Sequence, residues 1–534
     1  MNPELFLPAS RLERHRARGE WPVPSAAQLL AERLRNAPDR EFLIDGTQRL
    51  SFRAFEDRVS RLVAGLRALG VRRGDVVSWQ LPSWWEAAVL AVALEHLGAV
   101  QNPILPIYRE TEVGFIARET GTRILFVPGT FRSFDYRELA RSVRAQVPSI
   151  EHVVVVRDRP FEGARAFGDL LGERDGRAPV ERDLHEVSFV FYTSGTTSEP
   201  KGVLHSTSTL GAFARANARV SGSSESDVSL LQFPLTHIGG LAAFVVLPLL
   251  VGSRVVYLDV WDPERALDLV EKEGVTSAGG PPPILQGILS APGFRPERVR
   301  TLRTAGTGAA DIPPELVREV RRRLGVKSFR SYGLTECPML TSGRPEDPEE
   351  KCVSTDGRPS PGCEVRIVDE SGRACPPGTE GEIECFGPQL CLGYWNSELD
   401  REAFTADGFL RTGDLGILDE EGYLRVTGRK KDIIIRKGEN LSAKSIEDVL
   451  YEHPAVADAA VVGLPDPECG EKVCACVVLR PGASLTLAEL ARFMEEKRVM
   501  KQKIPERLEI LPSLPRNATG KVKKFELRAR FSGR

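Results

Sequence analysis

A stretch of hydroxyl and glycine residues in the middle of the chain ends in a single lysine. It reads Thr193-Ser194-Gly195-Thr196-Thr197-Ser198-Glu199-Pro200-Lys201-Gly202, and it follows the β-branched and aromatic segment 187–192, which predicts a buried strand. Glycine lets a backbone approach an anion closely, and successive N–H groups form anion-binding concavities. The pattern therefore favours a polyphosphate-binding loop. It is not a P-loop, because Pro200 and Gly202 flank the lysine, and composition alone leaves a flexible surface turn equally open.

Three further segments put a carboxylate or a lysine into a turn. They are Ser331-Tyr332-Gly333-Leu334-Thr335-Glu336, Arg411-Thr412-Gly413-Asp414-Leu415-Gly416 and Pro515-Arg516-Asn517-Ala518-Thr519-Gly520-Lys521. Taken singly, a Thr-Glu pair is usually a helix cap, Gly-Asp is usually a turn and Thr-Gly-Lys is usually a solvated loop. Each segment is a weak signal by itself, so the elements that position all four become important.

The first half of the chain alternates strands and helices. Apolar segments at 76–79, 124–127, 153–156 and 255–258 predict strands that are buried on both faces. Ser83-Trp84-Trp85-Glu86 has the form of a capping box, which would open an apolar helix through Leu97 that Gly98 ends. These alternating elements predict α/β architecture with mainly parallel sheets.

Turn signals become frequent after about Asp356. Asp407-Gly408 and Glu421-Gly422 separate short alternating strands such as 382–386, which predicts hairpins of an antiparallel, barrel-like unit. Further strand–helix units follow the basic run 429–431, and one helix is expected to start after Thr486 and reach about Arg498. The last ~100 residues are therefore expected to form a separate small α+β domain.

Length and composition exclude several classes of protein. The 534 residues are too many for one core, and the net charge of −2 does not indicate a nucleic-acid-binding face. Met1–Ser10 has no secretory signal, and the most apolar stretch, Leu241–Val251, is too short to span a membrane. The cysteines contain no CxxC pair, which favours free thiols over a zinc site. We expect a soluble cytoplasmic protein.

In this order and at these separations, the four segments resemble the motifs of the adenylate-forming superfamily, which includes acyl-CoA synthetases, amino-acid-activating adenylation domains and beetle luciferases. The resemblance extends from about Leu29 to the C-terminus. It implies a large N-terminal domain, residues 1–429, of two α/β sheet subdomains and a distorted antiparallel β-barrel. A small mobile α+β domain, residues 430–534, would follow, with its hinge at Lys431.

The resemblance also implies a reaction in two steps. A carboxylic acid would react with ATP in the presence of Mg²⁺ to give an acyl adenylate and pyrophosphate, and coenzyme A would then accept the acyl group. The β- and γ-phosphates would lie on the loop from Ser194 to Lys201. Thr335 would contact the α-phosphate, Glu336 would bind Mg²⁺, and Lys521 would bridge the carboxylate and the α-phosphate.

Other positions are implied to contact the nucleoside and the thiol. Asp414 would accept the ribose hydroxyls with Arg429 nearby, and Gly308-Ala309-Ala310 would lie along adenine, opposite Tyr332-Gly333. Gly438-Glu439-Asn440 would line the coenzyme A channel. Position 198 departs from the family, which usually has Gly there. Because Ser198 tolerates positive φ poorly, loop flexibility and ATP affinity are the properties that this change puts in doubt.

The acid-binding segment is expected at Phe233-Pro234-Leu235-Thr236-His237-Ile238-Gly239-Gly240. Amino-acid-activating relatives have an Asp where this chain has His237, so a free amino acid is not expected, although a core histidine without a substrate role stays open. The other expected wall residues are small, which predicts room for a medium-chain, alicyclic or aromatic acid. They are Gly279, Gly280, Thr304, Ala305 and Gly306.

The acceptor of the acyl group is inferred from the C-terminal end of the sequence. No carrier-protein domain follows Arg534, so coenzyme A is the simplest source of the thiol. A stand-alone enzyme that loads the phosphopantetheine of a carrier protein is the main alternative, and a binding protein or a luciferase-like oxygenase is a third. The sequence leaves monomer and homodimer both open.

Overall fold

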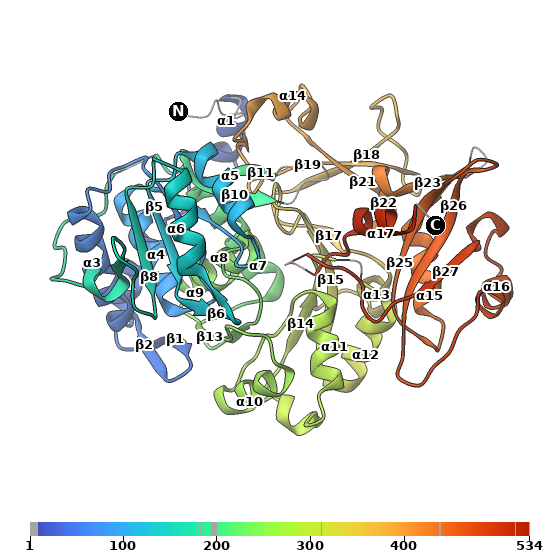
Figure 1. Ribbon diagram of the computed structural model, residues 1–534, viewed down its shortest axis with the longest axis horizontal. Coiled ribbons are helices and arrows are strands. Elements are labelled where there is room, and N and C mark those ends of the chain that lie inside the picture. Colours follow the sequence, from blue (N-terminus) through green and yellow to red (C-terminus); the bar gives the residue numbers. More distant parts are fainter. Residues whose placement is uncertain are drawn as a thin grey trace.

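The computed structural model describes residues 9–181, 183–193, 200–310, 312–436, 439–517 and 520–532. Figure 1 shows the sheets of the N-terminal part on the left and the orange and red C-terminal strands on the right. The expected α/β class, with a large N-terminal domain and a small C-terminal one, is confirmed.

The largest sheet contains three of the four strands expected from their continuous apolar character, β3, β5 and β8, whereas the fourth, β13, lies in another sheet. Its order is β20-β11-β10-β4-β3-β5-β8-β9, and the strands from β10 to β9 run parallel, as expected for strands covered by helices on both faces. The bounds are β3 Val76–Trp79, β4 Val100–Pro103, β5 Ile124–Pro128, β8 His152–Val156, β9 Arg165–Ala166, β10 Val187–Thr193, β11 Lys201–Ser206 and β20 Gly393–Tyr394.

Two four-stranded sheets form the rest of the α/β part. One has the order β12-β13-β1-β2 and the other β14-β15-β16-β17, and bridges from Ser277 to Ser229 and Thr304 connect them. The bounds are β1 Glu41–Asp45, β2 Gln48–Ser51, β12 Val228–Leu231, β13 Arg254–Tyr257, β14 Thr304–Thr307, β15 Lys327–Tyr332, β16 Thr341–Ser342 and β17 Arg358–Pro359.

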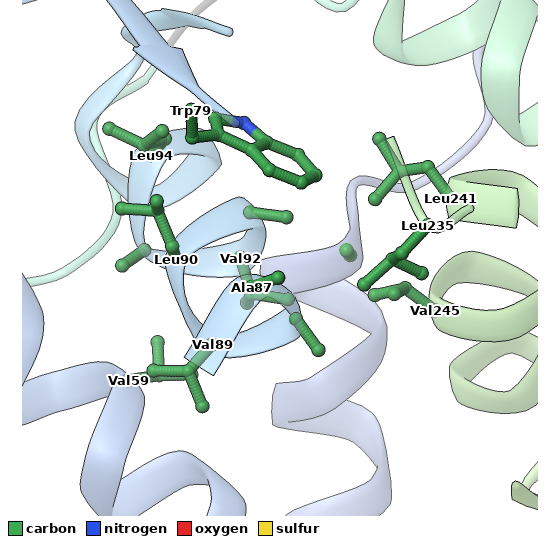
Figure 2. Close-up of a cluster of buried hydrophobic side chains, with 14 of the residues drawn as sticks. Val59, Trp79, Ala87, Val89, Leu90, Val92, Leu94, Leu235, Leu241 and Val245 are labelled. Carbon is green, nitrogen blue, oxygen red and sulfur yellow. The ribbon is translucent and has the colours of Figure 1, made fainter. Parts of the chain in front are cut away.

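Helices cover these sheets, and α4 is the most deeply buried of the longer ones. Figure 2 shows Trp79 of β3 beside Leu90 and Leu94 of α4, with Leu235 and Leu241 facing them. The main helices are α1 Ala9–Ala17, α2 Ala26–Asn36, α3 Phe52–Ala68, α4 Trp85–Leu97, α5 Glu110–Thr120, α6 Tyr136–Gln146, α7 Thr207–Ser221, α8 Ile238–Leu241, α9 Leu247–Val251, α10 Pro263–Glu273, α11 Pro282–Ser290, α12 Pro314–Leu324 and α13 Glu349–Ser354.

The start of α4 corrects one sequence prediction. The helix ends at Gly98 in the left-handed conformation, as expected, but no capping box opens it. The Ser83 hydroxyl instead donates to the Phe233 carbonyl at 3.2 Å and accepts the Leu235 N–H at 3.2 Å. Glu86 pairs with Arg157. The long-range partners satisfy these side chains better than the local helix end does, so Ser83 stabilises the segment before α8.

The expected hairpins are present after residue 356. They form an antiparallel sheet with the order β18-β19-β21-β22. The bounds are β18 Glu364–Val368, β19 Glu380–Phe386, β21 Leu410–Leu418 and β22 Leu424–Arg429, and α14 Asp400–Ala403 precedes β21.

The C-terminal domain has its own sheet and two buried clusters. The sheet order is β24-β23-β26-β25, with β27 beside β26. The helix expected after Thr486 is α16, and a capping box opens it, because the Thr486 hydroxyl accepts the Glu489 N–H. The bounds are β23 Ile433–Arg436, β24 Glu439–Ser442, β25 Val456–Asp466, β26 Gly470–Leu479, β27 Arg507–Ile510, α15 Ala443–Tyr451, α16 Leu487–Glu496 and α17 Lys524–Phe531.

The structure also bears on the predictions that the cysteines are free thiols and that no segment spans a membrane. The nine cysteines are free thiols, and Cys474 and Cys476 are both buried in one cluster, as their alternation on a strand predicts. Within the described ranges, no helix is both long enough and apolar enough to cross a bilayer.

Candidate active site

The strand expected before the phosphate loop is β10, and Lys201 begins the next strand. Thr193 pairs with Lys201 across the antiparallel ladder, so the two described ends of the predicted loop lie side by side. Ser194, Gly195, Thr196 and Thr197 lie outside the described residues, and their phosphate contacts stay predictions. Gly202 is required by packing, because an added Cβ would come within 3.0 Å of the Tyr192 ring and 3.1 Å of Trp395.

The turn after β15 presents Thr335 and Glu336. Leu334 and Cys337 exchange backbone hydrogen bonds of 3.3 and 3.1 Å, which closes the turn. The Tyr394 hydroxyl donates to Glu336 Oε1 at 2.8 Å, so one carboxylate oxygen is oriented by β20. Gly333 fits here because any Cβ would collide with the Met339 amide. The turn therefore holds a hydroxyl and a carboxylate in fixed positions.

Asp414 joins β15 to the antiparallel sheet. It accepts a 2.7 Å hydrogen bond from the Tyr332 hydroxyl and lies 2.9 Å from Arg429 Nε, its partner in the β21–β22 register. Burial, together with the Asp414 charge, raises the pKa of Tyr332 well above its usual value, so Tyr332 stays a neutral donor. The structure brings Tyr332, Asp414 and Arg429 together, although they are up to 97 residues apart in the sequence.

Gly308-Ala309-Ala310 follows β14 and lies against β15. A Cβ on Gly308 would collide with the Ser331 hydroxyl, and Ala309 has a φ of +66°, in the left-handed region that non-glycine residues rarely adopt. The close packing brings the backbone of this segment against Ser331, the residue before Tyr332. That arrangement places a flat peptide surface and an aromatic residue at one site.

His237 is the N-cap of α8. Its Nδ1 accepts the Gly239 N–H at 3.1 Å, so the hydrogen of the neutral ring is on Nε2. Burial, and secondarily the charge of Lys521, lowers the pKa of His237 to about 4, so the ring is neutral at pH 7. Lys521 belongs to the C-terminal domain, and its charge therefore acts on a residue of the N-terminal domain.

The backbone beside Lys521 comes close to the N-terminal domain at Gly520. A Cβ on Gly520 would lie 3.5 Å from Pro281 Cβ, at the N-cap of α11. The turn is closed by Asn517, whose N–H donates to the Lys521 carbonyl at 2.8 Å and whose side chain accepts the Lys521 N–H at 2.9 Å. Lys521 is thus presented by a turn that touches the N-terminal domain.

The small wall residues do not all leave space. A Cβ on Gly240 would collide with the Pro234 carbonyl, and a Cβ on Gly279 with the Gly306 carbonyl. A Cβ on Gly306 would come 3.3 Å from the Phe329 ring, and Thr304 Oγ1 is bonded to Ser277. The inference from small side chains to a large pocket is therefore wrong at Gly240 and Gly279, where glycine permits close backbone packing.

The proposed hinge lies between the two domains. The segment expected to line the thiol channel lies on the small C-terminal domain. Lys431 is in a short 3-10 turn, Lys430–Asp432, between β22 and β23. Its side chain is exposed, yet partial desolvation of the ammonium, with the charge of Arg429, lowers its pKa. Glu439 and Asn440 begin β24, whereas Gly438 lies outside the described residues.

Sequence reasoning missed His205 and Tyr394. Both contact the Thr335–Glu336 turn: His205 Nε2 lies 2.9 Å from the Thr335 carbonyl, and Tyr394 bonds to Glu336. The available signal was the strand alternation, which places His205 on the same face of β11 as Lys201.

Comparison with protein families identifies the fold and the motifs together. The model of the AMP-binding enzyme family matches residues 30–395, and that of the AMP-binding enzyme C-terminal domain matches residues 445–521. The chain belongs to the AMP-binding enzyme family. It is an AMP-forming ligase of carboxylic acids, and the predicted membership of the adenylate-forming superfamily is confirmed.

Individual relatives in this family act on different acids. The chain is 33% identical over 533 residues to the medium-chain fatty-acid–CoA ligase of Escherichia coli, and the match covers 99% of this chain and 94% of that protein. It is 34% identical to the salicyl-AMP ligase / salicyl-S-ArCP synthetase of Mycobacterium tuberculosis, over 97% of this chain and 93% of that one. The structure of ATP-bound MatB from Rhodopseudomonas palustris superposes with a TM-score of 0.87 at 28% identity, over 95% of this chain and 99% of MatB.

Proposed function

We propose that this AMP-binding enzyme joins an apolar carboxylic acid to coenzyme A through an acyl adenylate. The observation that carries the proposal is the position of the Lys521 turn, where the Gly520 backbone approaches the N-terminal domain and an added Cβ would lie 3.5 Å from Pro281 Cβ. A cation at that place can neutralise the two anions, a carboxylate and the α-phosphate, that must approach each other. Catalysis of phosphoryl-type transfer depends mainly on such positioning and charge neutralisation.

The nucleoside would bind beside Asp414. The Asp414 carboxylate, already oriented by Tyr332 and Arg429, would accept both ribose hydroxyls. Adenine would lie between the Gly308–Ala310 backbone and the Tyr332 ring. Hydrogen bonds to a charged acceptor contribute about 1.5–3 kcal/mol each, so this carboxylate would dominate nucleotide affinity.

Glu336 fits a magnesium ion that also binds the phosphates. Mg²⁺ prefers carboxylate and phosphate oxygens and usually takes one or two protein ligands. The donor set agrees with this, because the Tyr394 hydroxyl donates to one oxygen of the Glu336 carboxylate and so orients it. A bound Mg²⁺ would supply charge neutralisation of the triphosphate, and Lys201 and Thr335 would position the phosphates.

In the first step, a carboxylate oxygen of the acid attacks the α-phosphorus and pyrophosphate leaves. Lys521 bridges the attacking carboxylate and an α-phosphate oxygen in this proposal. In the second step the thiol sulfur attacks the acyl carbonyl, AMP leaves, and the thiol proton is lost. Rotation of residues 430–534 about Lys431 would withdraw Lys521 and bring Gly438-Glu439-Asn440 to the pantetheine.

The pocket favours an apolar acid. Burial keeps His237 neutral, with its pKa at about 4, and Ile238 beside it is buried in the apolar core. Neither residue offers a charge for a substrate ammonium, which agrees with the expectation that free amino acids are not substrates. Medium-chain, alicyclic and aromatic acids remain the proposed class, and the choice among them rests on measurement.

The direct test is a pyrophosphate-release screen. Octanoate, cyclohexanecarboxylate, benzoate and salicylate are each supplied with ATP and Mg²⁺, first without thiol and then with coenzyme A. We expect acid-dependent pyrophosphate release and an acyl-CoA product for at least one apolar acid. Pyrophosphate release without any acyl-CoA, but with loading of a phosphopantetheinylated carrier protein, would support the alternative that the salicyl-S-ArCP relative suggests. The absence of release with every acid would refute the proposal.

A pair of adjacent glycines tests where the acid lies. Gly239→Ala adds a methyl group 3.2 Å from His237 Nδ1, where a small shift can accommodate it. The proposal predicts a changed ranking of the acids with little loss of stability. Gly240→Ala is the contrast, because its methyl group would collide with the Pro234 carbonyl and should lower Tm for every substrate alike. An unchanged ranking in Gly239→Ala would place the acid elsewhere.

A further inference from the structure

His205 is a buried histidine that the proposed reaction does not use. It lies on β11, four residues after Lys201, and its exposed fraction is 0%. Its ring is at 73° to Phe191, with 6.0 Å between centroids, and its backbone pairs with Phe189. A completely buried polar ring in a sheet needs hydrogen-bond partners, because an unsatisfied one costs about 1–3 kcal/mol.

Both ring nitrogens have such partners. Nε2 lies 2.9 Å from the Thr335 carbonyl oxygen and Nδ1 lies 3.0 Å from the Thr209 hydroxyl. Burial lowers the pKa of His205 to about 4, so the ring is neutral and carries one N–H. Because a carbonyl oxygen can only accept, the hydrogen is on Nε2, and Nδ1 accepts from Thr209. The ring is therefore a donor to the Thr335 carbonyl.

This hydrogen bond joins two parts of the active site that are 130 residues apart in sequence. Period-2 alternation puts Lys201 and His205 on one face of β11. The next residue of the turn, Glu336, is tied to the neighbouring segment, because the Cys391 N–H donates to its carbonyl at 2.7 Å. The turn is thus connected to β11 by a side chain and to the approach to β20 by its backbone.

We propose that His205 is a positioning residue, which keeps the Thr335–Glu336 turn aligned with the strand that carries Lys201. The inference rests on the proposed roles of these residues in binding Mg²⁺ and the phosphates. Loss of the Nε2 hydrogen bond frees the Thr335 carbonyl, and the Glu336 carboxylate then loses its fixed position relative to β11, the strand that carries Lys201. The effect falls on adenylation, whereas attack of a thiol on a finished acyl adenylate needs neither Mg²⁺ nor the β- and γ-phosphates.

The test uses three variants of His205 in the full-length enzyme. In His205→Gln the amide NH₂ can replace the Nε2–H donor, in His205→Asn it is too short to reach Thr335, and in His205→Leu no donor is left. The measurement is pyrophosphate–ATP exchange with the best acid of the screen, titrated with MgCl₂. We expect the Mg²⁺ concentration at half-maximal rate to rise about three- to tenfold in the Leu and Asn variants, and less than about twofold in the Gln variant, as for one lost hydrogen bond.

A second buried histidine supplies the matched control. His185 is 4% exposed and packs its ring 5.0 Å from Trp21. His185→Leu removes a buried imidazole that packs on Trp21, so it should leave the Mg²⁺ requirement unchanged. Thioester formation from synthetic acyl adenylate and coenzyme A should stay within about twofold of wild type in the His205 variants that fold.

The possible outcomes distinguish the positioning role of His205 from a general packing defect and from a failure of the proposed metal site. Equal Mg²⁺ requirements in the Gln and Asn variants would overturn the positioning role, and this comparison remains even if the Leu variant does not fold. An equal loss of both half-reactions would also overturn it, because a general packing defect has that signature. Glu336→Gln tests the underlying assignment: if it leaves the Mg²⁺ requirement unchanged, the proposed metal site fails, whereas a large shift there with none at His205 rejects only the present inference.

Discussion

The two turns that present the candidate catalytic residues are held in different ways. The Thr335–Glu336 turn is connected to β11 through His205 and to β20 through Tyr394, so its partners belong to the N-terminal domain. The Lys521 turn is closed by Asn517, and the neighbouring Arg516 pairs with Asp458 of the same small domain. The contrast is that one half of the site is held by the N-terminal domain and the other half by the C-terminal domain, which the proposed rotation would move.

This difference suits a reaction in two steps. Groups that bind Mg²⁺ and ATP are needed at constant distances, which a turn with several buried partners provides. A lysine that is needed in the first step and obstructs the second is best placed on a domain that can withdraw it. Substitutions in each part of the site test this difference, and we expect the largest effect from replacement of Lys521.

Removal of the Lys521 ammonium should have the largest effect on the reaction rate. Lys521→Ala should decrease the rate of acyl-adenylate formation by about 10²–10³-fold, the usual loss when one preorganised charge or donor is removed. The same variant should still convert synthetic acyl adenylate and coenzyme A to thioester. Single-turnover assays of the two half-reactions measure this, and equal losses in both, in a folded variant, would contradict domain alternation.

A change in the half held by the N-terminal domain should affect nucleotide binding. Asp414→Ala removes the acceptor of the Tyr332 hydroxyl and the partner of Arg429. We expect the KM for ATP to rise by about 10–10²-fold, as for hydrogen bonds to a charged group. Asp407→Ala, which breaks a surface pair with Arg366, is the control. If both variants had the same KM for ATP, the ribose site would have to be sought elsewhere.

A substitution in the short turn that connects the two domains should slow the second step only. Lys431→Pro fixes φ in the short turn between β22 and β23, which restricts rotation of the small domain. We expect adenylation within about threefold of wild type and thioester formation slower by about tenfold or more. Lys430→Pro, one residue earlier in the same turn, shows whether the exact position matters. Normal thioester formation in Lys431→Pro would exclude this residue as the hinge.

Acidification should destabilise the N-terminal domain through its buried histidines. Burial lowers the pKa of His205 and His237 from 6.5 to about 4. Below pH 6.5 the unfolded chain binds protons that the folded chain does not, so stability is fully present above that pH and falls as the pH drops towards 4. Each ring should cost about 1.4 kcal/mol of unfolding free energy at pH 5.5. Asp400, whose pKa burial raises to about 6, acts in the opposite sense.

Comparing wild type with His205→Gln isolates one ring from such opposing groups. Gln does not titrate, so the decrease in Tm between pH 7 and pH 5.5 should be smaller in this variant. Differential scanning fluorimetry at the two pH values measures the difference. Parallel decreases in both proteins would mean that His205 is protonated without cost in the folded state.

Much of this organisation could be predicted because its signals are local. The α/β class and the strands β3, β5 and β19 follow from side-chain period and turn residues, and the Thr486 capping box from four consecutive positions. The motif order identified the family, and Asp414 and Tyr332, which the structure brings into contact, are both among the predicted site residues. Short-range chemistry of this kind is present in the sequence itself.

Predictions failed where a side chain had a choice of partners. Ser83 and Glu86 fit a capping box, but Ser83 bonds to the segment before α8 and Glu86 to Arg157. A local cap and a distant hydrogen bond are each worth about 1 kcal/mol, so only packing decides between them. Gly240 and Gly279 failed for a related reason, since absence of a side chain can leave space or admit a neighbouring backbone.

The sequence by itself determined which chemical groups are present, the elements that carry them and the family to which the chain belongs. The tertiary structure alone decided that His205 donates to the Thr335 carbonyl and that the charge of Lys521 reaches His237. Sequence period specifies the face of a strand or helix, but not what the fold places opposite that face. Long-range partners are chosen by the packing of whole elements, and this packing turns separate motifs into one site.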